Sequence, residues 1–225
     1  MADWDDDWNV PVRVKRVRRT EFPYPPPNRG LAAYGYNNLI IGICTVVFFL
    51  ELIFPNKMVD YFALWPSKVI YMPWQLVTAI FLHGGFDHYL VNMIVLFFFG
   101  AELERRVGGR KYLEIFFVSG IVGNLGYIAF CYATHSFNPA LGASGAIYGV
   151  MAALAIIAPE IRVLLFFFIP ISIRAALVLF ILYNLVSMLY MPFGGIAYSA
   201  HLAGIFAGLY YGHKIGRRPY FWFSF

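Results

Sequence analysis

The sequence predicts an all-α membrane protein, built as a bundle of six transmembrane helices with a long, membrane-associated first loop. Hydrophobic residues make up 60% of the 225 residues and charged residues only 13%, with a mean hydropathy of +0.66. This composition lies outside the usual range of soluble domains. The apolar residues also form long blocks between short polar stretches. Long blocks favour helices over a membrane β-barrel, whose strands would show short alternating runs.

Six apolar blocks are the expected membrane helices, at residues 38–54, 88–103, 112–133, 144–158, 173–190 and 198–215. The long first connection contains another apolar run, residues 76–82, which is too short to span a bilayer. We expect an interfacial or re-entrant helix there. Cys44 and Cys131 lie within apolar blocks, where a packing role is favoured over a disulfide.

Three regions follow from this pattern: a cytosolic tail at 1–36, the membrane domain at 37–216 and a short cytosolic tail at 217–225. The first tail combines an acidic start, a basic run and a proline stretch, which predicts an extended segment. Beside a membrane, a basic run marks orientation and lipid contact rather than a nucleic-acid site. No apolar run precedes about Asn38, so we expect no cleaved signal peptide.

Basic residues predict the orientation of the chain. If successive helices alternate in direction, 15 of the 17 Lys and Arg residues fall on the side of the N-terminus, and only Lys57 and Lys68 fall on the other. Basic loops stay on the cytoplasmic side. We therefore expect a multi-pass protein of the cell membrane with both termini cytoplasmic.

Polar residues are expected to converge near the outer ends of the second, fourth and sixth helices, which run in the same direction. They are His88, Asn92, Ser144 and His201. The fourth block has 15 residues and reaches about 22 Å, against a hydrocarbon core of about 30 Å. Ser144 should therefore lie below the outer surface. Irregular backbone before it, at 139–143, must be buried in protein or line a water-filled cavity.

Ser144 is the expected nucleophile and His201 its general base, because a serine needs a nearby base and histidine titrates near neutral pH. Two structural alternatives remain open: Ser144 as a plain N-cap and His201 as a packed helix residue. Small residues at four-residue spacing allow close helix packing that would bring the two side chains together. They are Gly145 and Gly149 on one helix and Gly204, Gly208 and Gly212 on the other.

His88 and Asn92 are expected to stabilise an oxyanion, because an i, i+4 pair shares one helix face. The Ser144 amide at a helix N-terminus adds a third donor. A metal site at His83, His88 and Asn92 is the alternative, but beyond Asp87 no Cys or carboxylate completes it. We expect no metal and no cofactor, and assign Asp87 to an N-cap.

Across residues 38–215 these features resemble the rhomboid family of intramembrane proteases. Gly142-Ala143-Ser144-Gly145 is similar to the family's GxSG motif, and Ala200-His201-Leu202-Ala203-Gly204 with Gly208 is similar to its histidine motif. His88-x-x-x-Asn92 resembles its oxyanion pair, with His83 five residues earlier. The run from Glu104 to Gly108 resembles its motif after the second helix.

The resemblance implies an intramembrane serine endopeptidase with a Ser-His dyad, in which Tyr148 stacks on the histidine and Gly142 forms the backbone approach to the oxyanion. Its partners would be single-span transmembrane protein substrates and membrane lipids, without nucleic acid. One departure stands in the first loop, where Trp74-Gln75 replaces the family's Trp-Arg pair.

The sequence leaves two other functions as alternatives. A catalytically silent rhomboid-like protein would bind membrane clients, but Ser144 and His201 are both retained. A small transporter or channel is disfavoured, because the inner halves of the helices offer almost no ionisable residues.

Overall fold

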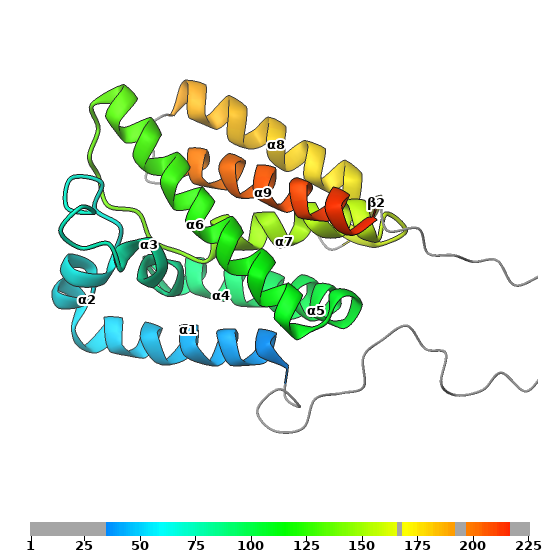
Figure 1. The fold of residues 1–225 in the computed structure, drawn as a ribbon, viewed down its shortest axis with the longest axis horizontal. Helices are drawn as coiled ribbons and strands as arrows, with labels where there is room; N and C mark the ends of the chain where they lie inside the picture. Colours follow the sequence, from blue (N-terminus) through cyan, green and yellow to red (C-terminus); the bar gives the residue numbers. More distant parts are fainter. Residues whose placement is uncertain (1–34, 166–167, 192–196, 217–225) are drawn as a thin grey trace, which may run out of the picture.

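The computed structural model describes residues 35–165, 168–191 and 197–216. Apart from Gly35 and Tyr36, the two expected tails lie outside these residues. The helices expected to span the membrane form one bundle (Figure 1). They are α1 (Tyr36–Ile53), α4 (Phe86–Val95) continued by the π-helical η3 (Leu96–Gly100) and α5 (Ala101–Val107), α6 (Gly109–Thr134), α7 (Ser144–Ile157), α8 (Ile173–Tyr190) and α9 (Tyr198–Gly216).

The six expected helices are all present, close to their expected bounds. Four spans are long and apolar enough to cross a membrane by length and composition: Tyr36–Ile53, Phe86–Val107, Gly109–Thr134 and Ile173–Tyr190. As expected, α7 is shorter, with 14 residues, or about 21 Å. In Figure 1 it begins inside the bundle rather than at its left-hand end.

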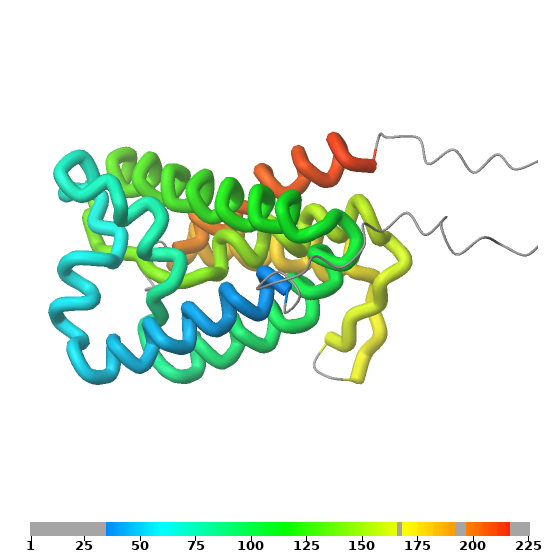
Figure 2. Tube along the Cα trace, turned by 60° about the horizontal axis from the view of Figure 1, so that its bottom comes forward, coloured from blue at the N-terminus to red at the C-terminus, as the bar shows by residue number. Residues whose placement is uncertain are grey.

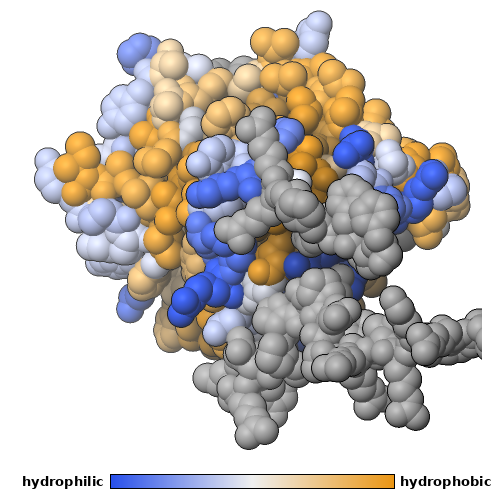
Figure 3. All heavy atoms as spheres, turned by 45° about the vertical axis from the view of Figure 1, so that its right-hand side comes forward, coloured by the Kyte–Doolittle hydropathy of each residue, from blue (hydrophilic) through white to orange (hydrophobic). Residues whose placement is uncertain are grey.

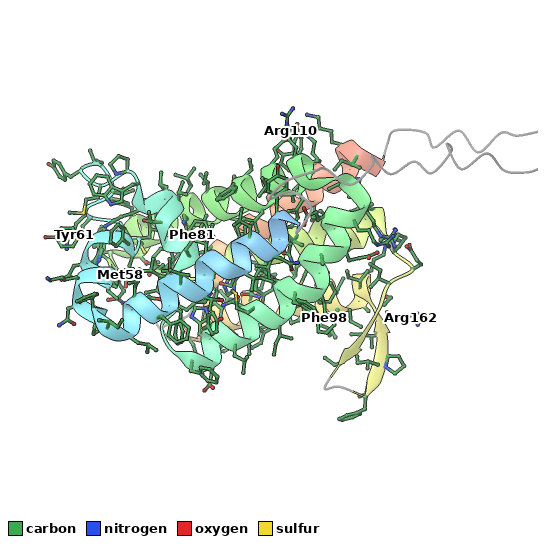
Figure 4. All side chains as sticks on the ribbon, turned by 90° about the horizontal axis from the view of Figure 1, so that it is seen from below. Met58, Tyr61, Phe81, Phe98, Arg110 and Arg162 are labelled. Atoms are coloured by element: carbon green, nitrogen blue, oxygen red, sulfur yellow. The ribbon has the colours of Figure 1, made fainter. Side chains whose placement is uncertain are left out.

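One end of the bundle, here called the basic end, carries Arg105, Arg106, Arg110, Lys111 and Lys214. Figure 4 shows Arg110 and Arg162 there, with Met58 and Tyr61 at the opposite end. Figure 3 shows hydrophilic residues gathered on this side, surrounded by hydrophobic ones. The Glu104 carboxylate accepts the backbone N–H groups of Tyr36 and Asn37 at 2.7 and 2.9 Å, which fixes the start of α1.

The first connection folds against the bundle at the opposite end, here called the loop end. It contains α2 (Pro55–Phe62), α3 (Gln75–Thr78) and the 3₁₀ turn η2 (Ala79–Phe81). The last two form the short helical segment expected at 76–82, whereas α2 was not predicted. Its Pro55 at the first helical position has the φ that a helix start requires.

Gln75, which replaces the arginine of the family's pattern, is completely buried. Its side-chain carbonyl accepts the Trp65 N–H at 3.1 Å, and its amide donates to the Tyr61 carbonyl at 3.3 Å. The glutamine therefore connects three parts of the first loop by neutral hydrogen bonds.

A β-hairpin, formed by β1 (Arg162–Leu165) and β2 (Ile169–Ser172), departs from the all-α expectation. The strands pair antiparallel, with Arg162 opposite Ser172. Figure 2 shows the hairpin standing off the bundle across the direction of the helices. Residues 161–172 are rich in β-branched and aromatic residues and too short for a spanning helix, which favours strands. The bundle itself remains entirely helical.

The core of the bundle is formed by α6, α7 and α9, which pack closely. A Cβ on Gly204 would overlap the carbonyl oxygen of Gly145, and one on Gly208 would overlap that of Gly149. Small residues are therefore required where α7 and α9 meet, as expected from their spacing. The same holds on α6, where a Cβ on Gly123 would lie 2.9 Å from the Ala200 carbonyl oxygen.

Candidate active site

A cavity of about 680 Å³ lies beside the start of α7. Residues of α4, α6, α7, α8 and α9 line it, together with the segment from Ser136 to Leu141. Polar side chains are few among them, and they include His88, Asn92, Ser144, Tyr148 and His201. The residues singled out in the sequence therefore surround one space.

The segment before Ser144 is irregular and is held by the first loop. Ala140 and Leu64 exchange two backbone hydrogen bonds of 2.9 Å, and the Gly142 N–H donates to the Ala79 carbonyl at 2.8 Å. These bonds satisfy backbone groups that the membrane interior cannot. They also fix the point at which α7 begins.

Ser144 and His201 are in direct contact, with 2.8 Å between Ser144 Oγ and His201 Nε2. Ser144 is the first residue of α7, and the N-cap is Ala143, so the hydroxyl does not cap the helix. The N-cap interpretation of Ser144 is therefore wrong. The hydroxyl is instead directed at the imidazole.

His201 is a buried residue of α9 with only 7% of its surface exposed. The Tyr148 ring stacks on its imidazole, with ring centroids 4.5 Å apart and an interplanar angle of 29°. Tyr148 lies one turn after Ser144 on α7, so the same helix supplies the hydroxyl and the stacking ring. Both ring nitrogens of His201 have polar partners. His201 therefore does more than fill space in a helix interface.

Asn184 of α8 is the second partner of His201, and the sequence analysis missed it. Its Oδ1 lies 2.8 Å from His201 Nδ1, and its Nδ2 donates to the Phe180 carbonyl at 2.8 Å. A lone amide within an otherwise apolar helix was the available clue, because intramembrane polar residues are usually functional. No sequence spacing connects it to His201.

His88 and Asn92 line the cavity from α4. The Gly84 N–H faces His88 Nδ1 at 3.4 Å, which favours the tautomer with hydrogen on Nε2. One amide hydrogen of Asn92 goes to the His88 carbonyl at 2.9 Å. This leaves the imidazole N–H and a second amide hydrogen as donors for a ligand. The Ser144 N–H, in the first turn of α7, has no acceptor within its own helix.

Gly142 has a φ of +127°, a region that favours glycine. A Cβ there would lie 2.8 Å from His88 Nε2 and 3.7 Å from Ser144 Oγ. Its backbone therefore passes between the two side chains and has no room for a larger residue. The Gly142 N–H donates to the Ala79 carbonyl. Gly142 therefore shapes the backbone path to the oxyanion site but offers no hydrogen-bond donor to it.

His83 and Asp87, the remaining residues of the metal alternative, lie apart from the cavity lining. His83 is buried against the rings of His88 and Tyr89. Asp87 is not the N-cap of α4: Gly85 is, and Asp87 follows in the first turn, where it complements the helix dipole. Within the described residues, no three His, Cys, Asp or Glu side chains gather as a metal site. Cys44 and Cys131 are free and buried.

Comparison with known proteins identifies the family of this chain. The family model described as "Rhomboid domain" matches residues 71–218. The chain belongs to the rhomboid family. Membership and the four apolar spans make it an integral membrane protein with an all-α rhomboid bundle.

Rhomboid relatives occur in bacteria and eukaryotes. The chain is 42% identical over 78 residues to "Putative rhomboid protease YdcA" of Bacillus subtilis, covering 34% of this chain and 37% of the relative. It is 29% identical over 146 residues to "Rhomboid protein 1, mitochondrial" of Saccharomyces cerevisiae, covering 64% and 42%. It is 38% identical over 85 residues to "Rhomboid protease GluP" of Bacillus subtilis, covering 38% and 16%. The chain thus spans less than half the length of these relatives.

Proposed function

We propose that this chain is an intramembrane serine endopeptidase, hydrolysing peptide bonds in or near transmembrane segments. The observation that carries the proposal is the 2.8 Å contact between Ser144 Oγ and His201 Nε2 at the cavity. A hydroxyl paired with a neutral imidazole is the minimal activated nucleophile. The names of two bacterial relatives, "Putative rhomboid protease YdcA" and "Rhomboid protease GluP", support it.

The reaction would proceed by acyl transfer. His201 Nε2 accepts the hydroxyl proton while Ser144 Oγ attacks the scissile carbonyl, and the imidazolium then protonates the leaving amine. The oxyanion would face the His88 imidazole, the Asn92 amide and the Ser144 N–H. A water molecule, activated by His201 in the same way, would then hydrolyse the acyl-enzyme. No step in this sequence requires a metal or a cofactor.

Single-span membrane proteins are the proposed substrates, with lipid as the surrounding partner. A helical segment must unwind before cleavage, because its amides are bonded internally and its carbonyls are shielded. The cavity, which Val91 and Val95 of α4 and Phe180 of α8 help to line, would receive the unwound strand. We further propose a cell-membrane location with both termini cytoplasmic, so that the loop end faces outward.

The test uses purified protein in liposomes with a single-span model substrate. Ser144→Ala and His201→Ala should each abolish cleavage, and a fluorophosphonate should label the wild-type protein at Ser144. Ser119→Ala is the matched control, because Ser119 is a fully buried serine of α6 whose hydroxyl has no hydrogen-bond partner among the described residues. It should retain activity, and a chelator should have no effect.

Two results would contradict this mechanism. Substantial cleavage by Ser144→Ala would exclude Ser144 as the nucleophile, and inhibition by a chelator that added metal reverses would indicate a metalloenzyme. Stable binding of single-span proteins without cleavage or labelling would instead favour the catalytically silent alternative.

A further inference from the structure

Asn184 lies at the centre of a hydrogen-bonded chain that runs through the bundle. The hydrogen bonds join the Phe180 carbonyl of α8 to the Asn184 side chain, Asn184 to His201 of α9, and His201 to Ser144 of α7. The three links measure 2.8 Å each. Asn184 has no exposed surface, so water does not compete for the two bonds that its side chain makes.

The donor and acceptor in each of these hydrogen bonds follow from the bond between Asn184 and the Phe180 carbonyl. The Phe180 carbonyl can only accept, so the Asn184 atom facing it is the NH₂ group. The other amide atom, Oδ1, must then face His201. Because an amide oxygen can only accept, His201 Nδ1 carries the hydrogen. In a neutral imidazole this leaves Nε2 with a free lone pair, pointing at the Ser144 hydroxyl.

We propose that Asn184 is a positioning residue that holds His201 in the tautomer able to accept the Ser144 proton. The inference rests on the proposed protease function and adds a third, neutral member to the Ser144–His201 pair. Asn184 does not touch the reacting atoms. It acts through the imidazole, and its Oδ1 also faces the positive charge that develops on the ring.

Tyr148 and Asn184 hold the ring in complementary ways. Stacking by Tyr148 restricts tilting of the imidazole but does not distinguish its two nitrogens. The Asn184 bond is made to one of the two nitrogens, Nδ1, and so does distinguish them. Among the described residues, the titratable groups facing His201 are Tyr148 on α7 and His88 on α4, and neither is a carboxylate.

The test measures the rate at which a fluorophosphonate acylates Ser144 between pH 5 and pH 9. Asn184→Leu removes the acceptor at nearly constant volume and should lower the rate at every pH by roughly 10- to 100-fold, the loss usual when the hydrogen bond that orients a metal-binding histidine is removed. Asn184→Asp restores an acceptor and adds a charge that stabilises the imidazolium. Its rate should recover at high pH, with the acid limb of the profile moved to higher pH.

Asn124→Leu is the matched control, because Asn124 of α6 is a structural amide that donates to the Leu76 carbonyl at 2.8 Å. It should change thermal stability without moving the pH profile. Nitrogen-15 NMR of histidine-labelled wild-type protein provides a second readout that needs no variant: the His201 resonances should report hydrogen on Nδ1.

The outcomes separate this inference from the proposed function. A wild-type protein without Ser144 labelling and without cleavage would defeat both. Normal wild-type activity with an unchanged rate and profile in Asn184→Leu, or a His201 resonance with hydrogen on Nε2, would overturn only the role of Asn184.

Discussion

Gly204→Ala should separate α7 from α9 and so test whether helix packing sets the geometry of the site. The added Cβ would overlap the Gly145 carbonyl oxygen, a backbone atom that cannot rotate away. Restoring a normal contact of about 3.5 Å requires the helices to move apart by more than about 1 Å. The 2.8 Å bond between Ser144 and His201 bridges the same two helices.

The expected magnitudes follow from that displacement. Overpacking costs about 1–3 kcal/mol, against a helix-propensity gain of about 1 kcal/mol for replacing glycine by alanine. We therefore expect a net loss of unfolding free energy of about 0–2 kcal/mol. An increase of about 1 Å would also take the Ser144–His201 distance beyond hydrogen-bonding range, for a loss of about 10²-fold in turnover.

Gly42→Ala is the control for the intrinsic effect of the substitution. Gly42 lies within α1, and a Cβ there would meet nothing within 4 Å. This variant should keep full activity and gain about 0.5–1 kcal/mol. Unfolding in detergent and cleavage in liposomes provide the two measurements. If Gly204→Ala matched Gly42→Ala in both, the proposed link between packing and catalysis would be wrong.

Three further predictions concern the oxyanion donors, the first loop and the cleavage position. His88→Ala or Asn92→Ala should each lower turnover by roughly 10²–10³-fold with a smaller change in KM; a change in KM alone would reassign the residue to substrate binding. Gln75→Ala would leave the Trp65 N–H and Tyr61 carbonyl without their partner, so it should cost about 1–3 kcal/mol in thermal or denaturant unfolding, whereas an unchanged stability would show that other contacts hold the loop. Mass spectrometry should locate cuts near the outer end of oriented substrates and fewer cuts when Gly and Pro there are replaced by Leu, because unwinding then costs more; cuts near the cytoplasmic end would contradict the proposed access from outside.

The sequence alone predicted most of the fold and the residues of the candidate site on α4, α7 and α9. The six apolar blocks predicted the six helices, because the bilayer requires long apolar segments with satisfied backbones. Glycine spacing predicted the contact of α7 with α9, since close approach depends on the absence of side chains. The contact between Ser144 and His201 followed from these two features.

Tertiary structure decided the features that depend on partners distant in the chain. Asn184 faces His201 only because α8 packs beside α9, and one apolar helix does not specify which face meets which neighbour. The identity of the α4 N-cap, Gly85 in place of Asp87, depends on how the first loop enters the helix. The folding of the same loop buries Gln75 and brings Trp65 to it, and its packing against the bundle gives the Gly142 N–H its acceptor on Ala79, a residue distant in the chain.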